Sequence, residues 1–360
     1  MPEISSMDSQ PYISIIFSGR NDNYGGDFNY RLQNTVNWYA YWVEKYQLHT
    51  ELLIVNYNPI PDAPGLEEMI SWPKGRKYLE IKLLHVPGSI HKEYVNLSIR
   101  KTVPLFEFIA KNLAIPRAKG EFILCTNADI LFSPSIFEWI SKRQLKPGIL
   151  YRSDRYDFKN SKSFKWPEND EEYESFELDL ERHVFKFFIH GGIYRLSFPK
   201  NIDLRKKLFS FYQSIRTYYY TRFTWIPIIR EVRILPMIPK EQLFFFKYHC
   251  NAAGDFALMG KQDWMDIRGY LEDTWISTHT DSLQVLSSVF SGKKIEVLPF
   301  PCYHQHHERR YDFIKKNPDM DIMQKRLNES YAQMESTKQP IINDNDNWWL
   351  PGHNLQITTI

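Results

Sequence analysis

The stretch that most constrains the fold is residues 110–132, AKNLAIPRAKGEFILCTNADILF. Gly120 ends a helix-like segment, and residues 121–126 then form a short apolar run that is typical of a buried parallel strand. This run ends at the tripeptide that begins with Asn127 and finishes with Asp129, just before a second apolar group. Because α/β sheets bind ligands at the carboxyl ends of their strands, Asp129 lies where a ligand would be expected.

The carboxylate of Asp129 permits two interpretations. Carboxylate oxygens are hard ligands suited to Mg²⁺ or Mn²⁺, and such an ion could carry a diphosphate. Alternatively, Asp129 could cap a helix that follows the strand. The tripeptide alone leaves both interpretations open.

The composition indicates a folded enzyme-sized domain. The chain has 360 residues, of which 43% are hydrophobic and 24% charged, so it can form one large α/β domain or two small ones. Its net charge of +2 provides no basic face, and we expect no nucleic-acid partner.

The cysteines and the absence of apolar targeting segments favour a cytoplasmic protein. Cys125, Cys250 and Cys302 lie in apolar surroundings, and their odd number and spacing predict buried thiols in a reducing compartment. No signal peptide and no run of 18 apolar residues is found in the sequence.

The first strand is expected over residues 12–17 and ends in the polar turn Ser-Gly-Arg-Asn-Asp, which contains Ser18, Arg20 and Asp22. In this turn Arg20 could pair with a phosphate and Asp22 with a base or ribose. An ordinary strand-to-helix turn is the alternative. The second strand is expected over residues 51–59, and the side-chain amide of Asn56 could both donate to and accept from a base edge.

Further elements follow from periodicity and turn residues. Helices are expected over 28–46 and 104–113, and from Ser133 and Thr278 onward. Strands are expected over 78–86, 148–152 and 294–299. Residues 158–181 are acidic and irregular, which predicts an insertion or surface excursion over about 156–185. The region around His91 could form a lid.

A second insertion, a helical one, is expected over about 204–248. Within it, residues 204–246 interleave aromatic with basic side chains. Such a stretch could contact the inner face of an anionic membrane peripherally, form a homodimer interface, or pack its aromatic residues in the core.

At this point the chain resembles a known family. Asn112, the residues Arg-Ala-Lys-Gly-Glu-Phe-Ile from Arg117, and the tripeptide ending at Asp129 are similar to the core motif of GT-A glycosyltransferases, most closely family 2. The resemblance implies an α/β, Rossmann-like fold with a mostly parallel central sheet flanked by helices. The family's donor-binding D-x-D has Asn127 in place of its first Asp, which leaves one carboxylate.

Two later segments extend the resemblance. Gly254 and Asp255 open a stretch similar to the family's donor-lining strand, and Asp281 matches the position of its acceptor base. A helix cap is the alternative for Asp281. The run Tyr-His-Gln-His-His-Glu matches the place of a metal-binding His, so His304 and His306 are expected to join Asp129, with His307 close behind. A polar surface turn is the alternative for this run.

The resemblance implies a GT-A domain over residues 1–320, followed by a C-terminal helix and tail over 321–360. The implied activity is transfer of a sugar from a nucleoside diphosphate sugar to a saccharide or lipid-linked acceptor, with inversion and with Mn²⁺ or Mg²⁺, in surface polysaccharide or glycoconjugate synthesis. The expected donor-binding residues are Ser18, Arg20, Asp22, Asn56, Asn112, Arg117, Asn127, Gly254 and Asp255. A nucleotidyltransferase and a non-catalytic carbohydrate-binding protein remain as alternatives.

Overall fold

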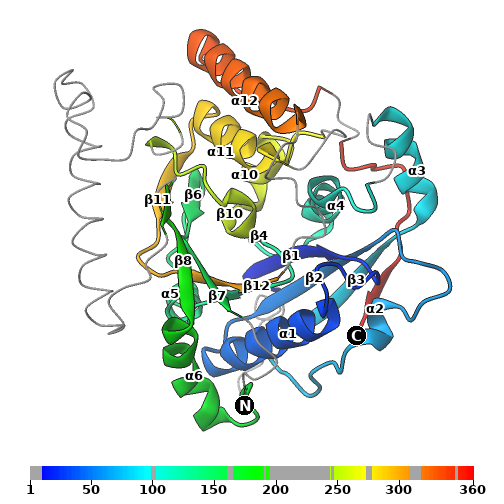
Figure 1. Cartoon of the computed structure of the whole chain (residues 1–360), viewed down its shortest axis with the longest axis vertical. Coiled ribbons are helices and arrows are strands. Elements are labelled where there is room, and N and C mark those ends of the chain that lie inside the picture. The colour runs from blue at the N-terminus through cyan, green and yellow to red at the C-terminus, as the bar shows by residue number, and fades with distance from the viewer. Residues whose placement is uncertain are drawn as a thin grey trace, which may run out of the picture.

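A mixed, mostly parallel sheet organises the chain (Figure 1). The computed structural model describes residues 10–98, 103–159, 165–189, 192–194, 244, 247–272, 278–307, 318–344 and 348–360. Within these ranges eight strands form the central sheet in the order β11-β6-β10-β4-β1-β2-β3-β13. Their bounds are β1 Ile13–Gly19, β2 Thr50–Tyr57, β3 Leu79–Val86, β4 Phe122–Cys125, β6 Ile149–Arg152, β10 Ala257–Gly260, β11 Lys294–Val297 and β13 Ile357–Thr359.

Most neighbouring pairs in this sheet are parallel: β1 with β2 and β4, β2 with β3, and β6 with β11. The strands β10 and β13 run antiparallel to their neighbours. The α/β class with a mostly parallel central sheet, predicted from the sequence, is therefore confirmed.

A second sheet lies beside the first. Its five strands, counted over the same described ranges, have the order β5-β12-β7-β8-β9. They are β5 Ile130–Phe132, β7 Arg155–Lys159, β8 Val184–Ile189, β9 Gly192–Tyr194 and β12 Cys302–His306. Because β5 directly follows β4, the turn between them carries Asp129 from the first sheet to the second.

Helices cover both faces of the central sheet (Figure 1). On one face lie α1 Phe28–Lys45, α5 Pro134–Ser141 and α6 Asp170–Arg182; on the other lie α3 Gly88–Leu97, α4 Glu107–Ala114, α10 Lys261–Asp266, α11 Thr280–Phe290 and α12 Pro318–Thr337. Side chains of β1 point alternately to the two faces of the sheet and so contribute to the apolar core on each face. Ile15 and Phe17 belong to the cluster under α1, and Ile16 belongs to the cluster under α4. Leu32, Val36 and Tyr39 recur at helical spacing and bury one face of α1.

Gly120 makes the entry into β4 possible. A Cβ at this position would lie 2.4 Å from the backbone nitrogen of Ser14, so any side chain would collide with β1. The N–H of Gly120 also donates to Ser14 Oγ at 2.8 Å. The close approach of the two chains fixes β4 against β1 and so sets where Asp129 emerges.

Some elements differ from the sequence-based expectations. The acidic stretch forms α6, because Asn169 caps it by accepting from the N–H of Glu172, while Phe176 and Leu180 lie one turn apart and are buried. The region around His91 forms the helix α3, in which the His91 side chain is buried. The strand β13 was not predicted.

The predicted aromatic and basic segment 204–246 lies, apart from Phe244, outside the described residues. None of the helices that the structure describes is both long and apolar enough to span a membrane.

Candidate functional site

Several polar side chains lie at the edge of the central sheet that is formed by the carboxyl ends of β1, β2 and β4. Ser18 is the penultimate residue of β1, and Gly19 next to it pairs with Asn56 of β2. On the other side of β1, β4 ends at Cys125 opposite Ile16, and the Asn127 turn follows. The antiparallel β10 begins at this same edge, just after Asp255, because its first residue pairs with Cys125.

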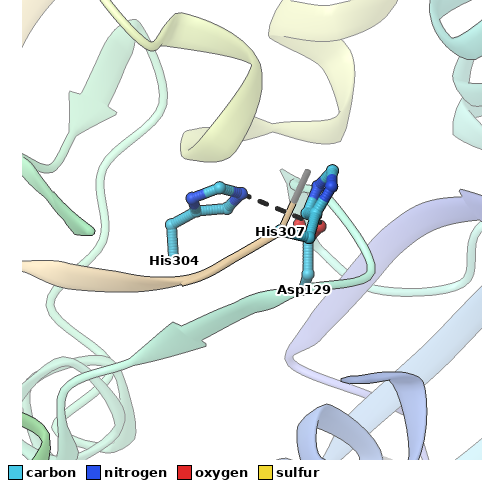
Figure 2. A group of neighbouring side chains, drawn as sticks. All are labelled: Asp129, His304 and His307. Carbon is cyan, nitrogen blue, oxygen red and sulfur yellow. Dashed lines mark ion pairs between the residues drawn. The ribbon is translucent and has the colours of Figure 1, made fainter. Parts of the chain in front are cut away.

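At this edge the structure brings Asp129 to two histidines (Figure 2). Oδ2 of Asp129 lies 3.1 Å from Nε2 of His307 and 3.8 Å from Nε2 of His304. Nε of Arg31, from α1, lies 3.7 Å from the same oxygen. No helix follows Asp129, since β5 begins at the next residue, so the alternative that it caps a helix is wrong.

These neighbours keep Asp129 ionised. Burial opposes the charge on this carboxyl, but its contacts with His304, His307 and Arg31 outweigh burial and hold the pKa well below its usual range. Asp129 is therefore a carboxylate near neutral pH, the form that a cation requires.

The donor set fits a divalent transition metal. Asp129, His304 and His307 each offer one ligand atom, and the three atoms lie within 4.8 Å of one another. Ligands about 2.1 Å from one ion in an octahedral shell lie about 3 Å apart, so small side-chain shifts would suffice. Two imidazoles and one carboxylate suit Mn²⁺ better than Mg²⁺, which prefers oxygen ligands.

His306 does not take the position expected for it beside Asp129. It belongs to a second possible ligand group, with Asp157 and His304, and its ring packs edge-on against Phe185 with 5.0 Å between centroids. The reason is that β12 ends at His306, so strand alternation no longer applies to the next residue and His307 turns back toward Asp129.

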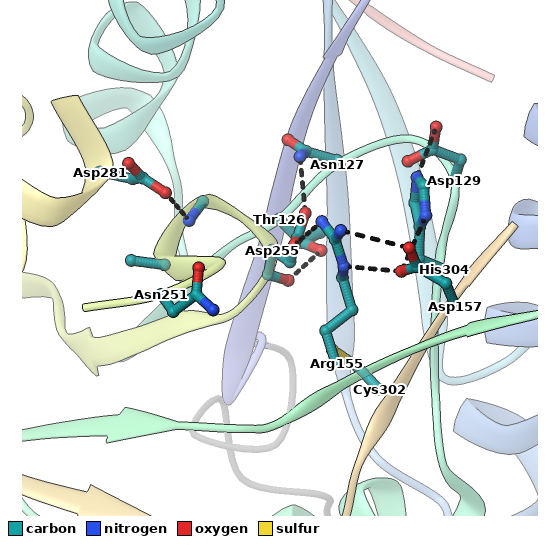
Figure 3. A network of polar contacts seen from close by, with 12 residues as sticks. Thr126, Asn127, Asp129, Arg155, Asp157, Asn251, Asp255, Asp281, Cys302 and His304 are labelled. Atoms are coloured by element: carbon teal, nitrogen blue, oxygen red, sulfur yellow. Dashed lines mark hydrogen bonds and ion pairs between the residues drawn. The ribbon is translucent and has the colours of Figure 1, made fainter. Parts of the chain in front are cut away.

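A network of buried charges extends from this group across the site (Figure 3). Nδ1 of His304 lies 3.2 Å from Oδ1 of Asp157, and Nε of Arg155 lies 2.9 Å from that same oxygen. Nη1 of Arg155 lies 2.7 Å from Oδ2 of Asp255. Burial alone would lower the pKa of the Arg155 guanidinium, but Asp255 and Asp157 raise it, so this residue remains a fixed positive charge.

The network continues through Asn127, the first residue of the tripeptide that ends at Asp129. Its Nδ2 donates to Oδ1 of Asp255 at 2.9 Å, and its Oδ1 accepts from Nζ of Lys111 at 2.8 Å. The fully buried Lys111 also contacts Glu107 at 2.6 Å and the carbonyl oxygen of Gly254 at 3.3 Å. The side chains of Asn127 and Asp255 therefore make their polar contacts with other residues of the protein.

Asp281 lies at the other end of this network. It follows the first residue of α11, whose N-cap is His279, so Asp281 is not the capping residue. Its Oδ2 accepts from the N–H of Gly254 at 2.9 Å and its Oδ1 from the N–H of Ser282 at 2.8 Å. Gly254 belongs to η4, Ala253–Asp255, which thus lies between Asp281 and Lys111.

The polar turn after β1 is held by its own contacts. Nε of Arg20 donates to the carbonyl oxygen of Asn58 at 2.7 Å, and its Nη1 lies 2.9 Å from Oδ2 of Asp22. Asn56 is buried, with its Nδ2 3.5 Å from Nδ1 of His85. Among the residues that the structure describes, Oδ1 of Asn56 has no hydrogen-bond partner.

Two of the residues expected to bind the donor make contacts with distant segments of the chain. The amide of Asn112 is buried and exchanges two 2.8 Å hydrogen bonds with the backbone of Tyr270, where Gly269 turns with φ of 67°. Arg117 donates to the carbonyl oxygens of Trp349, Leu350 and His353. Both residues therefore hold distant segments of the chain in place.

Sequence reasoning did not select Asp157 or Lys111. The R-Y-D pattern in β7 places Arg155 and Asp157 on one face of a strand, which is a signal for a buried ion pair. The (i, i+4) spacing of Glu107 and Lys111 is a similar signal on α4.

No protein-family model and no curated protein sequence matches the chain. Among solved structures, the mannosyltransferase PcManGT from Pyrobaculum calidifontis, in complex with GDP-Man and Mn²⁺, is similar with a TM-score of 0.39 and 10% identity, over 93% of this chain and 66% of that one. S. aureus TarS 1–349 is similar with a TM-score of 0.38 and 11% identity, over 81% of this chain and 60% of that one. The chain thus spans less than two thirds of either structure, and at these scores the likeness assigns neither a family nor an activity.

Proposed function

We propose that this protein transfers a sugar from a nucleoside diphosphate sugar to an acceptor hydroxyl, with inversion and with the help of a divalent cation. The observation that carries the proposal is the group of Asp129, His304 and His307 at the edge of the sheet where ligands bind. The order of motifs along the chain, similar to that of GT-A glycosyltransferases, supports the same function.

The donor would bind along the ends of β1 and β2. The side chain of Arg20 carries the positive charge nearest to this edge in the β1 turn and would face a phosphate after exchanging its contact with Asp22. The buried Oδ1 of Asn56 would accept a hydrogen bond from a nucleotide base. Ser18, on β1, precedes Gly19, the residue that pairs with Asn56.

Departure of the diphosphate develops negative charge on its oxygens. A Mn²⁺ or Mg²⁺ ion held by Asp129, His304 and His307 would neutralise this charge. The buried pair of Arg155 and Asp255 would keep the Asn127 turn rigid, so that Asp129 stays in position while the bond breaks.

Asp281 would serve as the general base. The acceptor oxygen forms a bond to the anomeric carbon, the bond from that carbon to the diphosphate breaks, and the acceptor proton passes to the Asp281 carboxylate. The N–H groups of Gly254 and Ser282 orient the carboxylate for this transfer. Attack from the side opposite the leaving group gives inversion.

The experiment is a screen of UDP, GDP, CMP and dTDP sugars for turnover, with Mn²⁺ and with EDTA. We expect turnover with Mn²⁺, and its loss with EDTA or in Asp129→Asn. Asp154→Asn is the matched control, because Asp154 is also a buried carboxylate beside an imidazole, at 2.9 Å from Nε2 of His249.

The two alternatives are distinguished by this screen and by a parallel assay with nucleoside triphosphates and sugar phosphates. Binding of nucleotide sugars without any turnover would indicate a non-catalytic carbohydrate-binding protein. Release of pyrophosphate from a nucleoside triphosphate and a sugar phosphate would indicate a nucleotidyltransferase. Either result would overturn the proposed function.

A further inference from the structure

The imidazole of His304 lies between two carboxylates, one at each ring nitrogen (Figure 3). Its Nε2 is 3.8 Å from Oδ2 of Asp129, and its Nδ1 is 3.2 Å from Oδ1 of Asp157. Asp157 is the more buried of the two acids, with a side chain 2% exposed against 14% for Asp129. The two carboxylates are therefore placed for different tasks.

The guanidinium groups beside Asp157 and Asp129 indicate which of the two carboxylates can hold a cation. Oδ1 of Asp157 already lies 2.9 Å from Nε of Arg155, whereas Oδ2 of Asp129 lies 3.7 Å from Nε of Arg31. A cation bound at Asp157 would lie closer to a guanidinium than a cation bound at Asp129, and the repulsion between two positive charges grows as they approach. The cation therefore belongs on the Asp129 side of His304.

Strand pairing fixes the position of Asp157 relative to His304. His304 on β12 and Asp157 on β7 are directly opposite each other in the parallel register, so their Cα positions are set by the sheet. Arg155 binds Asp157 on one side and Asp255, at 2.7 Å, on the other, which holds the Asp157 carboxylate against rotation. This arrangement is rigid enough to orient a ring.

We infer that Asp157 is a positioning residue, which accepts the Nδ1–H of His304 and so directs the Nε2 lone pair toward Asp129 and the cation. The inference rests on the proposed function for the cation itself. Imidazoles that bind metals commonly donate their other N–H to a carboxylate, which fixes the tautomer and the ring orientation. The 3.2 Å contact is not aligned as a full hydrogen bond, and contacts of this kind often tighten when a ligand binds.

The first test measures Mn²⁺ affinity and stoichiometry by titration followed by electron paramagnetic resonance. Loss of the acceptor in Asp157→Ala should weaken Mn²⁺ binding about 10- to 100-fold, as removal of such a partner typically does. Asp157→Asn, which keeps an acceptor oxygen, should recover part of that loss. The matched control Asp154→Ala removes the acid facing His249 and should stay within about twofold of the wild type.

The second test reads the tautomer of His304 in the wild-type protein, so it does not depend on the folding of any variant. Nitrogen-15 chemical shifts of labelled histidine, with the His304 signals assigned through His304→Gln, should show the proton on Nδ1 in neutral rings. A proton on Nε2 would overturn the inference, and so would unchanged Mn²⁺ affinity in a folded Asp157→Ala.

The outcomes also separate this inference from the proposed function. Two Mn²⁺ ions per chain, one of them lost in Asp157→Ala, would make Asp157 a ligand and overturn its positioning role. A wild type that binds no Mn²⁺ would refute the cation in the proposed function, and the tautomer would still decide the role of Asp157.

Discussion

The backbone N–H of Gly254 donates to Oδ2 of Asp281 at 2.9 Å, across 27 residues of sequence. The N–H of Ser282 holds the second oxygen at 2.8 Å. The carboxylate is thus fixed between η4 and its own helix, and its position does not depend on a bound substrate.

Asp281→Asn should lower kcat about 10²- to 10⁴-fold, because it removes the proton acceptor while keeping the shape of the side chain. The amide can accept from only one of the two N–H groups, so the free energy of unfolding should fall by about 0.5–1.5 kcal/mol. Donor affinity should stay close to that of the wild type. Steady-state kinetics, isothermal titration with the donor and denaturant unfolding measure the three quantities, and turnover at the wild-type rate would remove Asp281 from the mechanism.

His307 and His306 should differ in their effect on cation binding. Nε2 of His307 lies 3.1 Å from Asp129, while His306 lies in the group with Asp157. His307→Ala should therefore weaken Mn²⁺ binding by at least about tenfold, and His306→Ala far less. Titration of Mn²⁺ in the two variants compares them directly, and a greater loss in His306→Ala would restore the ligand set expected from the sequence.

Glu272 should make stability depend on pH. Burial raises the pKa of its carboxyl from its usual value of 4.5 to about 7, although hydrogen bonds with Asn112 and Tyr94 work in the opposite direction. The folded protein therefore binds a proton that the unfolded chain releases between these values. The stability it contributes is fully present below about pH 4.5 and is lost as the pH rises through about 7.

Glu272→Gln keeps the side chain neutral at every pH. It should raise the free energy of unfolding by about 1–3 kcal/mol at about pH 8 and change it little at about pH 5. Denaturant unfolding at the two pH values tests this. An equal effect at both would show that ionisation of Glu272 is not the cause.

The sequence predicted those parts of the site that depend on local order. The apolar run before Asp129 forms β4, and the acid emerges at the ligand-binding edge, because strand length and periodicity are local properties. The roles of Asn112 and Arg117 were not predictable in this way. Their partners, at Tyr270 and at Trp349 to His353, lie 158 and more than 230 residues away.

The choice between neighbouring histidines also required the three-dimensional structure. Whether His306 or His307 meets Asp129 depends on where β12 ends, and strand ends are set by pairing with β5 and β7. Similarly, an R-Y-D pattern suggests an ion pair in β7 but does not show that His304 lies opposite Asp157.

Asn127→Asp would create the two-acid D-x-D pattern of GT-A glycosyltransferases, and we expect it to destabilise this protein. The amide Nδ2 of Asn127 donates to Oδ1 of Asp255 at 2.9 Å, so a second carboxylate there would lose that bond and meet a like charge. The free energy of unfolding should fall by about 1–3 kcal/mol. Mn²⁺ affinity should not rise, because Lys111 holds the other oxygen of this side chain at 2.8 Å.

A double-mutant cycle separates the contact between residues 127 and 255 from general effects of the substitution. Combining Asn127→Asp with Asp255→Asn reverses the amide and the carboxylate, so one hydrogen bond between them can form again. Asp157 remains beside Arg155 at 2.9 Å, so the guanidinium keeps a counter-charge. The coupling energy from denaturant unfolding should be about 0.5–3 kcal/mol in favour of the reversed pair. A stable Asn127→Asp with tighter Mn²⁺ binding would instead show that residue 127 faces the cation.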